Sequence, residues 1–240
     1  MAKPLALIFD LDGTLIDSAP DIHAAANAVF AARGYQGFAF DTVKGFIGNG
    51  VGVLVARLLA HQGLPEAGTL HRDMVLDFVR IYEEAVDLTK LYPNVAEALD
   101  QLATAGHPLG ICTNKPVGPA RAVLRHFGLD GRFATVIGGD SLAVRKPDPA
   151  PLHAAIAALG GGPAFFVGDS EVDAETAQAA GVALALFTEG YRTTEVARLI
   201  AQTLAAKDGP LVPLIAETGG QNTLIADSSA LPEQLVKDAM

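Results

Sequence analysis

The sequence is poor in cysteine and in long apolar runs, and each shortage excludes a class of protein. Cys112 is the only cysteine among 240 residues, so an intramolecular disulfide is impossible and a disulfide-stabilised secreted fold is excluded. The apolar stretch before Asp10 is too short for a signal peptide or a membrane span. We therefore expect a cytoplasmic protein with no membrane partner.

The charge balance excludes a further class of partner. Acidic residues number 27 and basic residues 17, which gives a formal net charge of −10. Nucleic acids and anionic membrane surfaces are bound by basic faces, so we expect neither as a partner. An acidic chain can still bind a phosphate group if a metal ion or a local cluster of lysines and N–H groups offsets its charge.

The sequence does contain a regular alternation of short apolar runs and helical stretches. The apolar runs have the pattern of strands buried on both faces, and they cover residues 5–9, 108–114, 134–140, 164–169 and 182–190. Helices are expected between them, at residues 95–105, 117–127, 149–159 and 172–180. The alternation predicts an α/β fold with a doubly wound parallel sheet, that is, a Rossmann-like core.

One interval departs from this alternation. Between residues 18 and 88 no convincing strand is found, and amphipathic helical patterns cover residues 21–32, 51–62 and 70–87. Because an ordinary crossover is far shorter, we expect a helical cap inserted after the first strand. The predicted division is a core of residues 1–17 and 89–192, a cap of residues 18–88 and an atypical C-terminal tail of residues 193–240.

Polar residues cluster at the predicted strand ends, where ligands bind in open parallel sheets. They are Asp10 and Asp12 after the first strand, Thr113 and Asn114 after the second, Asp169 and Asp173 after a later one, and Lys146 before a helix. Each residue alone has an ordinary explanation, such as a solvated turn, a surface lysine or a helix cap. Together they suit a hard divalent cation, Mg²⁺, and an anionic substrate group.

A cation between crowded carboxylates would keep them ionised. Ionised carboxylates beside a bound phosphate could then take part in its hydrolysis. One carboxylate could attack phosphorus, and the acid two residues later could protonate the leaving oxygen and then activate water. An aspartyl-phosphate intermediate divides a very slow hydrolysis into two easier steps.

Four segments carry a resemblance to a known family. They are DLDGTLID, TNK, RKPDP and GDSEVD, which in this order resemble the four motifs of the haloacid dehalogenase-like hydrolases. The resemblance extends from Leu5 to about Tyr191. Within that family the chain is most similar to the phosphoglycolate phosphatases, in segments such as FIGNGV and VGDSEVDAETAQAAG.

The resemblance implies a role for each catalytic residue. Asp10 would be the nucleophile and a metal ligand, and Asp12 would be the general acid/base, with its backbone carbonyl on the metal. Lys146 would neutralise charge on the nucleophile and the phosphate. Asp169 would complete the Mg²⁺ ligands, and Asp173 would support the site by orienting bound water or Lys146.

It also implies how a substrate is bound. Thr113 and Asn114 would bind the phosphoryl oxygens. In the cap, Gly48, Asn49 and Gly50 form the loop expected to face the substrate, where backbone N–H groups could bind a small carboxylate. Arg57 is a weaker candidate for that contact.

The acid at position 12 bears on the reaction class. Dehalogenases of this superfamily lack an acid two residues after the nucleophile, so Asp12 favours a phosphatase or a phosphomutase. We expect a small phosphorylated metabolite as the partner, 2-phosphoglycolate above others, and a monomer or homodimer. The alternatives are a phosphatase for another metabolite, a phosphomutase, and a protein left inactive or self-associating by its tail.

The tail does not continue the family pattern. From about Thr193 it resembles part of the aldehyde dehydrogenase half of bifunctional proline-catabolic enzymes, through TEVARLI and ETGGQN. Glu217 would correspond to an active-site acid there, but the segment lacks a catalytic cysteine. Residues 222–236 also have the pattern of a strand, a loop and a helix, which could replace the last elements of the sheet.

Overall fold

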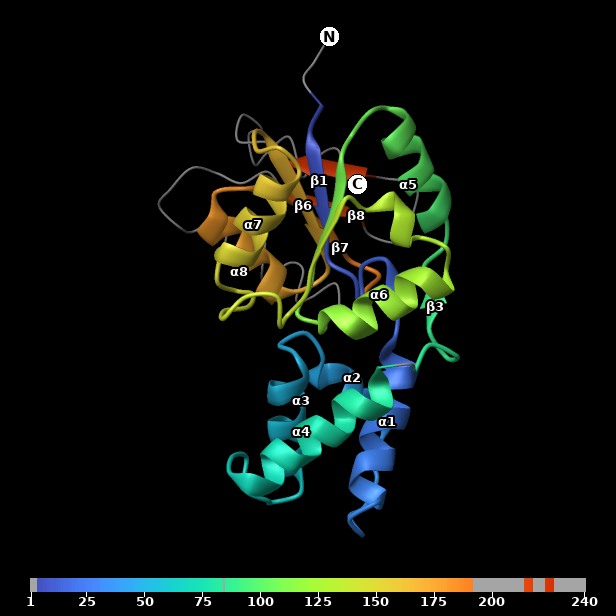
Figure 1. Ribbon diagram of the computed structural model, residues 1–240, viewed down its shortest axis with the longest axis vertical. Helices are drawn as coiled ribbons and strands as arrows, with labels where there is room; N and C mark the ends of the chain where they lie inside the picture. Colours follow the sequence, from blue (N-terminus) through green and yellow to red (C-terminus); the bar gives the residue numbers. More distant parts are fainter. Residues whose placement is uncertain (1–3, 84, 192–213, 218–222, 227–240) are drawn as a thin grey trace.

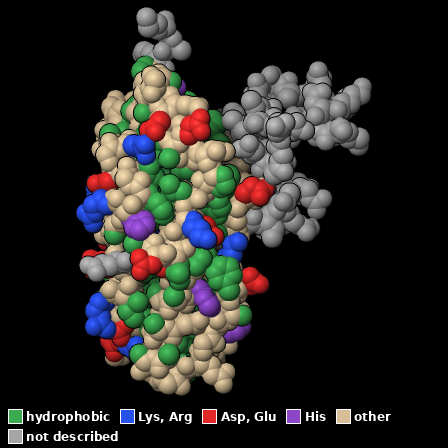
Figure 2. Space-filling model, turned by 90° about the vertical axis from the view of Figure 1, so that its right-hand side faces the viewer, with side chains coloured by type: hydrophobic (Ala, Val, Ile, Leu, Met, Phe, Trp, Pro, Cys, Tyr) green, Lys and Arg blue, Asp and Glu red, His purple; other side chains and the backbone are tan. Residues whose placement is uncertain are grey.

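The computed structural model describes residues 4–83, 85–191, 214–217 and 223–226. These residues form an α/β core with a bundle of helices, α1 to α4, at one end (Figure 1). Within the described ranges no helix is long and apolar enough to cross a membrane. On the face shown in Figure 2, basic side chains are scattered among acidic and apolar ones and form no continuous basic patch.

The sheet is parallel over its central strands, which confirms the predicted fold class. Its order is β5-β4-β1-β6-β7-β8-β9. Strands are therefore added to the sheet on both sides of β1. The central strands are β1 (Ala6–Phe9), β4 (Leu109–Cys112), β5 (Thr135–Ile137), β6 (Ala164–Gly168) and β7 (Ala183–Phe187). In register, Leu7 pairs with Leu109 on one side and with Phe165 on the other.

Helices cover both faces of this sheet. They are α5 (Val95–Thr104), α6 (Val117–His126), α7 (Ala150–Ala158) and α8 (Glu171–Ala180), with a 3₁₀ turn η1 at Asp130–Arg132. Alternate side chains of β1 enter opposite cores: Leu7 and Phe9 pack with α5 and α6, whereas Ala6 and Ile8 pack with α7 and α8. Burial on both faces explains why the strands have continuous apolar sequences.

The cap has an apolar core of its own. Its helices are α1 (Ala19–Ala31), α2 (Phe40–Phe46), α3 (Val51–His61) and α4 (Thr69–Tyr82), and Phe30, Leu58 and Phe78 are buried between them. The sequence did not predict α2, since seven residues are too few for a helical pattern to emerge. The prediction of a helix to residue 87 was wrong, because α4 ends at Tyr82.

A short antiparallel pair joins core and cap. Ile16–Asp17 (β2) pairs with Lys90–Leu91 (β3), and two-residue strands leave no periodic pattern from which to predict them. Nearby, the buried carboxylate of Asp21 accepts hydrogen bonds from the backbone N–H groups of Leu88 and Thr89 and from the Thr89 hydroxyl. The predicted limits of the cap lie beside this junction and stay a prediction.

Two strands of the tail extend the sheet. Leu214–Glu217 (β8) pairs in parallel with β7, and Thr223–Ala226 (β9) pairs antiparallel with β8. The strand expected at the start of residues 222–236 is therefore present as β9, whereas β8 was not predicted. The expected helix lies outside the described residues, and the resemblance of the tail to an aldehyde dehydrogenase stays a prediction.

The junction generates a test of stability. Replacing Asp21 with alanine leaves the N–H groups of Leu88 and Thr89 and the buried Thr89 hydroxyl without their acceptor, so we expect the free energy of unfolding to fall by about 3 kcal/mol. Urea titration followed by circular dichroism measures it. Asp41→Ala, which removes an exposed acid from the first turn of α2, should change stability little; an equal loss in both variants would contradict the proposed role of Asp21.

Candidate active site

The predicted site residues meet where the carboxyl ends of β1, β4 and β6 face the cap. A small cavity of about 40 Å³ lies there. The core contributes Asp10, Asp12, Thr113, Asn114, Lys115 and Pro116 to its wall, and the cap contributes Ile22, Ile47, Gly48, Gly50, Val51, Leu54, Phe78 and Tyr82. Parallel strands bring these positions together because their carboxyl ends share one edge of the sheet.

Asp10 and Lys146 form a buried ion pair at the base of the site. Lys146 Nζ lies 3.0 Å from Asp10 Oδ1 and 2.6 Å from Asp173 Oδ1. Burial raises the pKa of the Asp10 carboxyl from 3.8 to about 6, although the charge of Lys146 opposes this. Burial lowers the pKa of Lys146, but the carboxylates of Asp10 and Asp173 outweigh it and hold that pKa above its ordinary value. Lys146 therefore remains cationic.

Asp173 uses both of its oxygens inside the protein. Oδ1 contacts Lys146, while Oδ2 accepts hydrogen bonds from the N–H groups of Asp169 and Ser170 and from the Ser170 hydroxyl. With Ser170 it closes a capping box at the start of α8. A Cβ on Gly168 would lie 2.4 Å from its Cγ, so glycine is needed for this close approach. Asp173 is thus arranged to hold Lys146 in place.

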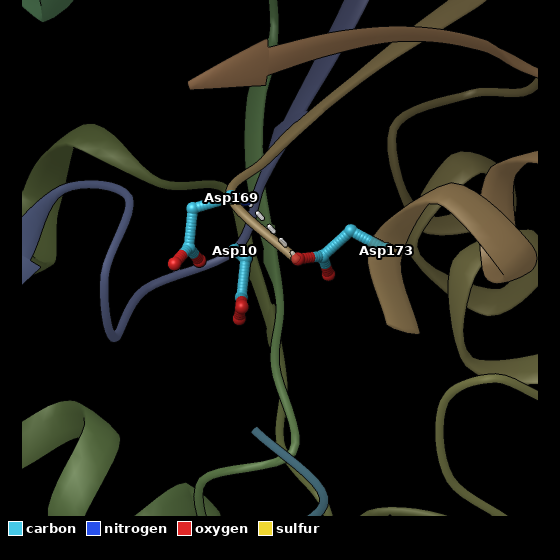
Figure 3. A group of neighbouring side chains, drawn as sticks. All are labelled: Asp10, Asp169 and Asp173. Atoms are coloured by element: carbon cyan, nitrogen blue, oxygen red, sulfur yellow. Dashed lines mark hydrogen bonds between the residues drawn. The ribbon is translucent and has the colours of Figure 1, made fainter. Parts of the chain in front are cut away.

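Asp169 lies beside Asp10 and is directed toward the same space (Figure 3). Its oxygens accept hydrogen bonds from the Thr14 hydroxyl and from the N–H of Tyr191. Gly13 approaches it closely: φ is +86°, and a Cβ there would lie 2.4 Å from Asp169 Oδ2. Both the backbone conformation and the contact therefore require glycine at position 13.

The three carboxylates are close enough to hold a metal ion. One oxygen from each of Asp10, Asp169 and Asp173 lies within 4.8 Å of the others. Among the described residues, the ion pairs of these three carboxylates and of Asp12 involve two ammonium groups, those of Lys115 and Lys146. The donors are all oxygens, so the site fits a hard divalent cation.

Asp12 is not part of that cluster. Its Oδ1 accepts a hydrogen bond of 2.5 Å from the Ser18 hydroxyl and lies 3.0 Å from Lys115 Nζ. Ser18 in turn contacts the Tyr191 hydroxyl, and it makes no side-chain hydrogen bond to the start of α1. The Asp12 side chain is therefore not a candidate metal ligand, which leaves its backbone carbonyl for that role.

Sequence reasoning missed the partners of Asp12. Lys115 ends the TNK segment, which was the only signal that could have drawn attention to it. Tyr82 contacts Lys115 Nζ through its hydroxyl from the end of α4, and nothing in the sequence pointed to it. Ser18 and Tyr191, which lie 173 residues apart, meet only in the folded chain.

Thr113 and Asn114 lie at the predicted place. A hydrogen bond with the Thr113 side chain lowers the pKa of Asp10. The Asn114 side-chain amide donates 3.0 Å hydrogen bonds to the carbonyls of Gly48 and Lys146, while its own oxygen is buried without a hydrogen-bond partner among the described residues. Asn114 thus joins the cap loop to the segment that carries Lys146.

The cap loop is only partly as expected. Gly48 and Gly50 line the cavity, whereas Asn49 is not among its lining residues. Arg57 donates to the Phe46 carbonyl and does not line the cavity either. Arg145 was not predicted, yet its guanidinium flanks the loop, since a Cβ on Gly50 would lie 3.0 Å from Arg145 Nη1.

Comparisons with known proteins agree on one family. Residues 5–181 match the family described as haloacid dehalogenase-like hydrolase. A phosphoglycolate phosphatase from Cereibacter sphaeroides is 52% identical over 196 residues, covering 80% of this chain and 89% of its own. One from Rhodobacter capsulatus is 48% identical over 189 residues, covering 79% and 86%.

A solved structure gives the same result. The crystal structure of a predicted phosphoglycolate phosphatase from Haemophilus somnus has a TM-score of 0.76 and 33% sequence identity, and the match covers 85% of this chain and 92% of that one. The family model, the sequence relatives and the fold agree with the motif-based expectation: the chain belongs to the haloacid dehalogenase-like hydrolase family.

Proposed function

We propose that this phosphoric monoester hydrolase is a Mg²⁺-dependent phosphatase that acts through an aspartyl-phosphate on Asp10, with 2-phosphoglycolate as its favoured substrate. One observation carries the proposal: Asp10 lines the cavity, Lys146 Nζ lies 3.0 Å from its Oδ1, and the carboxylate of Asp169 lies within 4.8 Å of it. The substrate is inferred from relatives named phosphoglycolate phosphatases. A cytoplasmic location and a monomeric or dimeric state stay predictions.

Asp10, Asp169 and the backbone carbonyl of Asp12 would hold the magnesium ion. When bound, the ion supplies positive charge that lets a dianionic phosphate approach the carboxylates. Asp173 would not be a ligand, because Lys146 and three hydrogen bonds already occupy its oxygens. Its role would be to keep the Lys146 ammonium beside Asp10.

The proposed reaction has two steps. An Asp10 oxygen bonds to phosphorus as the bond to the leaving oxygen breaks, and protonated Asp12 gives its proton to that oxygen. Asp12, now a carboxylate, then takes a proton from water as the water oxygen attacks phosphorus, which releases phosphate and regenerates Asp10. Lys146 offsets the charge on Asp10, and Thr113 and the neighbouring N–H groups bind the phosphoryl oxygens.

The wall of the cavity favours a small substrate. Apolar cap residues, among them Ile47, Leu54 and Phe78, close over it, and the described cap contributes no charged side chain to the wall. A carboxylate on the substrate would therefore be bound by backbone N–H groups between Gly48 and Val51, at the start of α3.

Replacement of Asp10 by asparagine tests the nucleophile. We expect phosphate release from 2-phosphoglycolate in the presence of Mg²⁺ to fall by about 10⁴-fold or more, since the amide cannot form the phosphoenzyme. A colorimetric assay over a dozen small phosphate esters, with and without Mg²⁺, measures the loss and ranks the substrates. Asp41→Asn, at an exposed cap acid, serves as the control.

Two results of this assay would contradict the proposal. Activity that survives Asp10→Asn would remove the nucleophile assignment. An isomerised product with little free phosphate would indicate a phosphomutase.

The raised pKa of Asp10 predicts how metal affinity depends on pH. Asp10 must be ionised to bind a cation, and in the metal-free protein it is protonated below its pKa of about 6. The apparent affinity for Mg²⁺ should therefore fall about tenfold per pH unit below that value and become constant above about pH 7, with proton release on binding at the acidic end. Isothermal titration calorimetry in two buffers of different ionisation enthalpy measures both effects.

Asp10→Asn is the control for this titration, since it should bind Mg²⁺ weakly and without the pH dependence near pH 6. An affinity of the unmodified protein that is constant between about pH 5 and pH 7 would show that Asp10 is not a ligand.

A further inference from the structure

Lys115 connects the acid/base residue to the cap. The lysine follows β4 in the core, and 3% of its side chain is exposed. Its ammonium lies 3.0 Å from Asp12 Oδ1 on one side and contacts the Tyr82 hydroxyl on the other. Tyr82 is the last residue of α4, and it is itself buried. A single ammonium thus joins a core carboxylate to a cap hydroxyl.

The charge state of this group follows from its surroundings. Burial lowers the pKa of Lys115, but Asp12 and Tyr82 outweigh it and hold the pKa above its ordinary value. Burial also raises the pKa of Tyr82 to about 12, so Tyr82 stays a neutral phenol whose oxygen accepts from the ammonium. A buried ammonium needs both partners, because an unmet charge in this environment is strongly unfavourable.

The contacts on Asp12 are unequal, which orients its carboxylate. Oδ1 receives the Ser18 hydroxyl at 2.5 Å and Lys115 Nζ at 3.0 Å, whereas from the part of the chain that the structure describes Oδ2 has only a 3.5 Å contact with Lys115. Two donors therefore fix Oδ1, and Oδ2 remains the oxygen able to exchange a proton. If Tyr82 moved away with the cap, Lys115 would lose one of the partners that fix its direction.

The preceding residue repeats the arrangement. The Asn114 side chain donates to the carbonyl of Gly48 in the cap and to the carbonyl of Lys146 in the core. Two consecutive residues at the end of β4 thus contact the cap and a proposed catalytic residue at the same time. Movement of the cap would disturb both residues together.

We infer that Lys115 is a positioning residue that, held by Tyr82 of the seated cap, orients the Asp12 carboxylate for proton transfer. The inference rests on the proposed role of Asp12 as general acid. The alternative is that the Lys115 ammonium binds a carboxylate of the substrate directly and does not orient Asp12. That alternative would not need Tyr82.

The test compares three small phosphates in the full chain with Mg²⁺. 2-Phosphoglycolate and ethyl phosphate have alkoxide leaving groups that need a proton, and only the first has a carboxylate. Acetyl phosphate releases acetate, which leaves without one. The variants are Lys115→Met and Tyr82→Phe, singly and together, with Lys115→Arg as the conservative replacement. Lys90→Met and Tyr35→Phe, at an exposed and a half-buried site, are matched controls.

We expect kcat/KM for both alkyl phosphates to fall about 10²-fold in Lys115→Met and about tenfold in Tyr82→Phe, with less than about threefold loss for acetyl phosphate. The double variant should be no worse than Lys115→Met, because both residues act through Asp12. Lys115→Arg should recover part of the activity. Melting temperatures verify folding, and Tyr82→Phe, which removes one oxygen atom, provides the test if Lys115→Met does not fold.

Three results would overturn the inference. Equal losses on all three substrates would indicate a structural role for the pair. A loss confined to 2-phosphoglycolate in Lys115→Met, with Tyr82→Phe unchanged, would indicate carboxylate binding. Additive losses in the double variant would show that Lys115 and Tyr82 act independently of each other. Each can occur while Asp10→Asn is inactive, so failure of this inference is distinguishable from failure of the proposed function.

Discussion

The buried pair of Asp10 and Lys146 is the interaction on which the rest of the site depends. Charges out of water are stable only when their partners are well placed, and here Asp173 supplies the second partner. The capping box at the start of α8 fixes Asp173, and Gly168 gives it room. Asp10 after β1, Asp173 at the start of α8 and Lys146 therefore form one unit. Each charged group is stabilised by the opposite charge beside it.

A second buried ion pair, Lys115 with Asp12, lies nearer the cap and has a different character. The first pair has its further charged partner, Asp173, in the core, whereas the second contacts Tyr82 of α4. Cap helices have their own apolar core, so the cap can act as a unit in its contacts with the sheet. The ion pairs of the proposed nucleophile Asp10 and its lysine thus lie in the core, while the ammonium paired with Asp12 is shared with the cap.

Much of this architecture could be predicted, for reasons that particular elements make plain. Strands such as β1 and β4 are buried on both faces, so their apolar sequences are continuous and end where the chain meets the site. Predictions failed where the local pattern is short or the cause is distant: α2 has seven residues, β2 and β3 have two each, and α4 ends at Tyr82 without a glycine or proline to mark it.

The sequence by itself determined the fold class, because strand periodicity is a local property of the chain, and its motifs predicted the reactive groups Asp10, Asp12, Lys146 and Asp169. Only the tertiary structure decided the partners of those groups. Ser18, Tyr82, Lys115 and Tyr191 gather around Asp12 from both domains, and Asn114 joins Gly48 to Lys146. Such contacts depend on how the cap is seated on the sheet, and no local pattern records that arrangement.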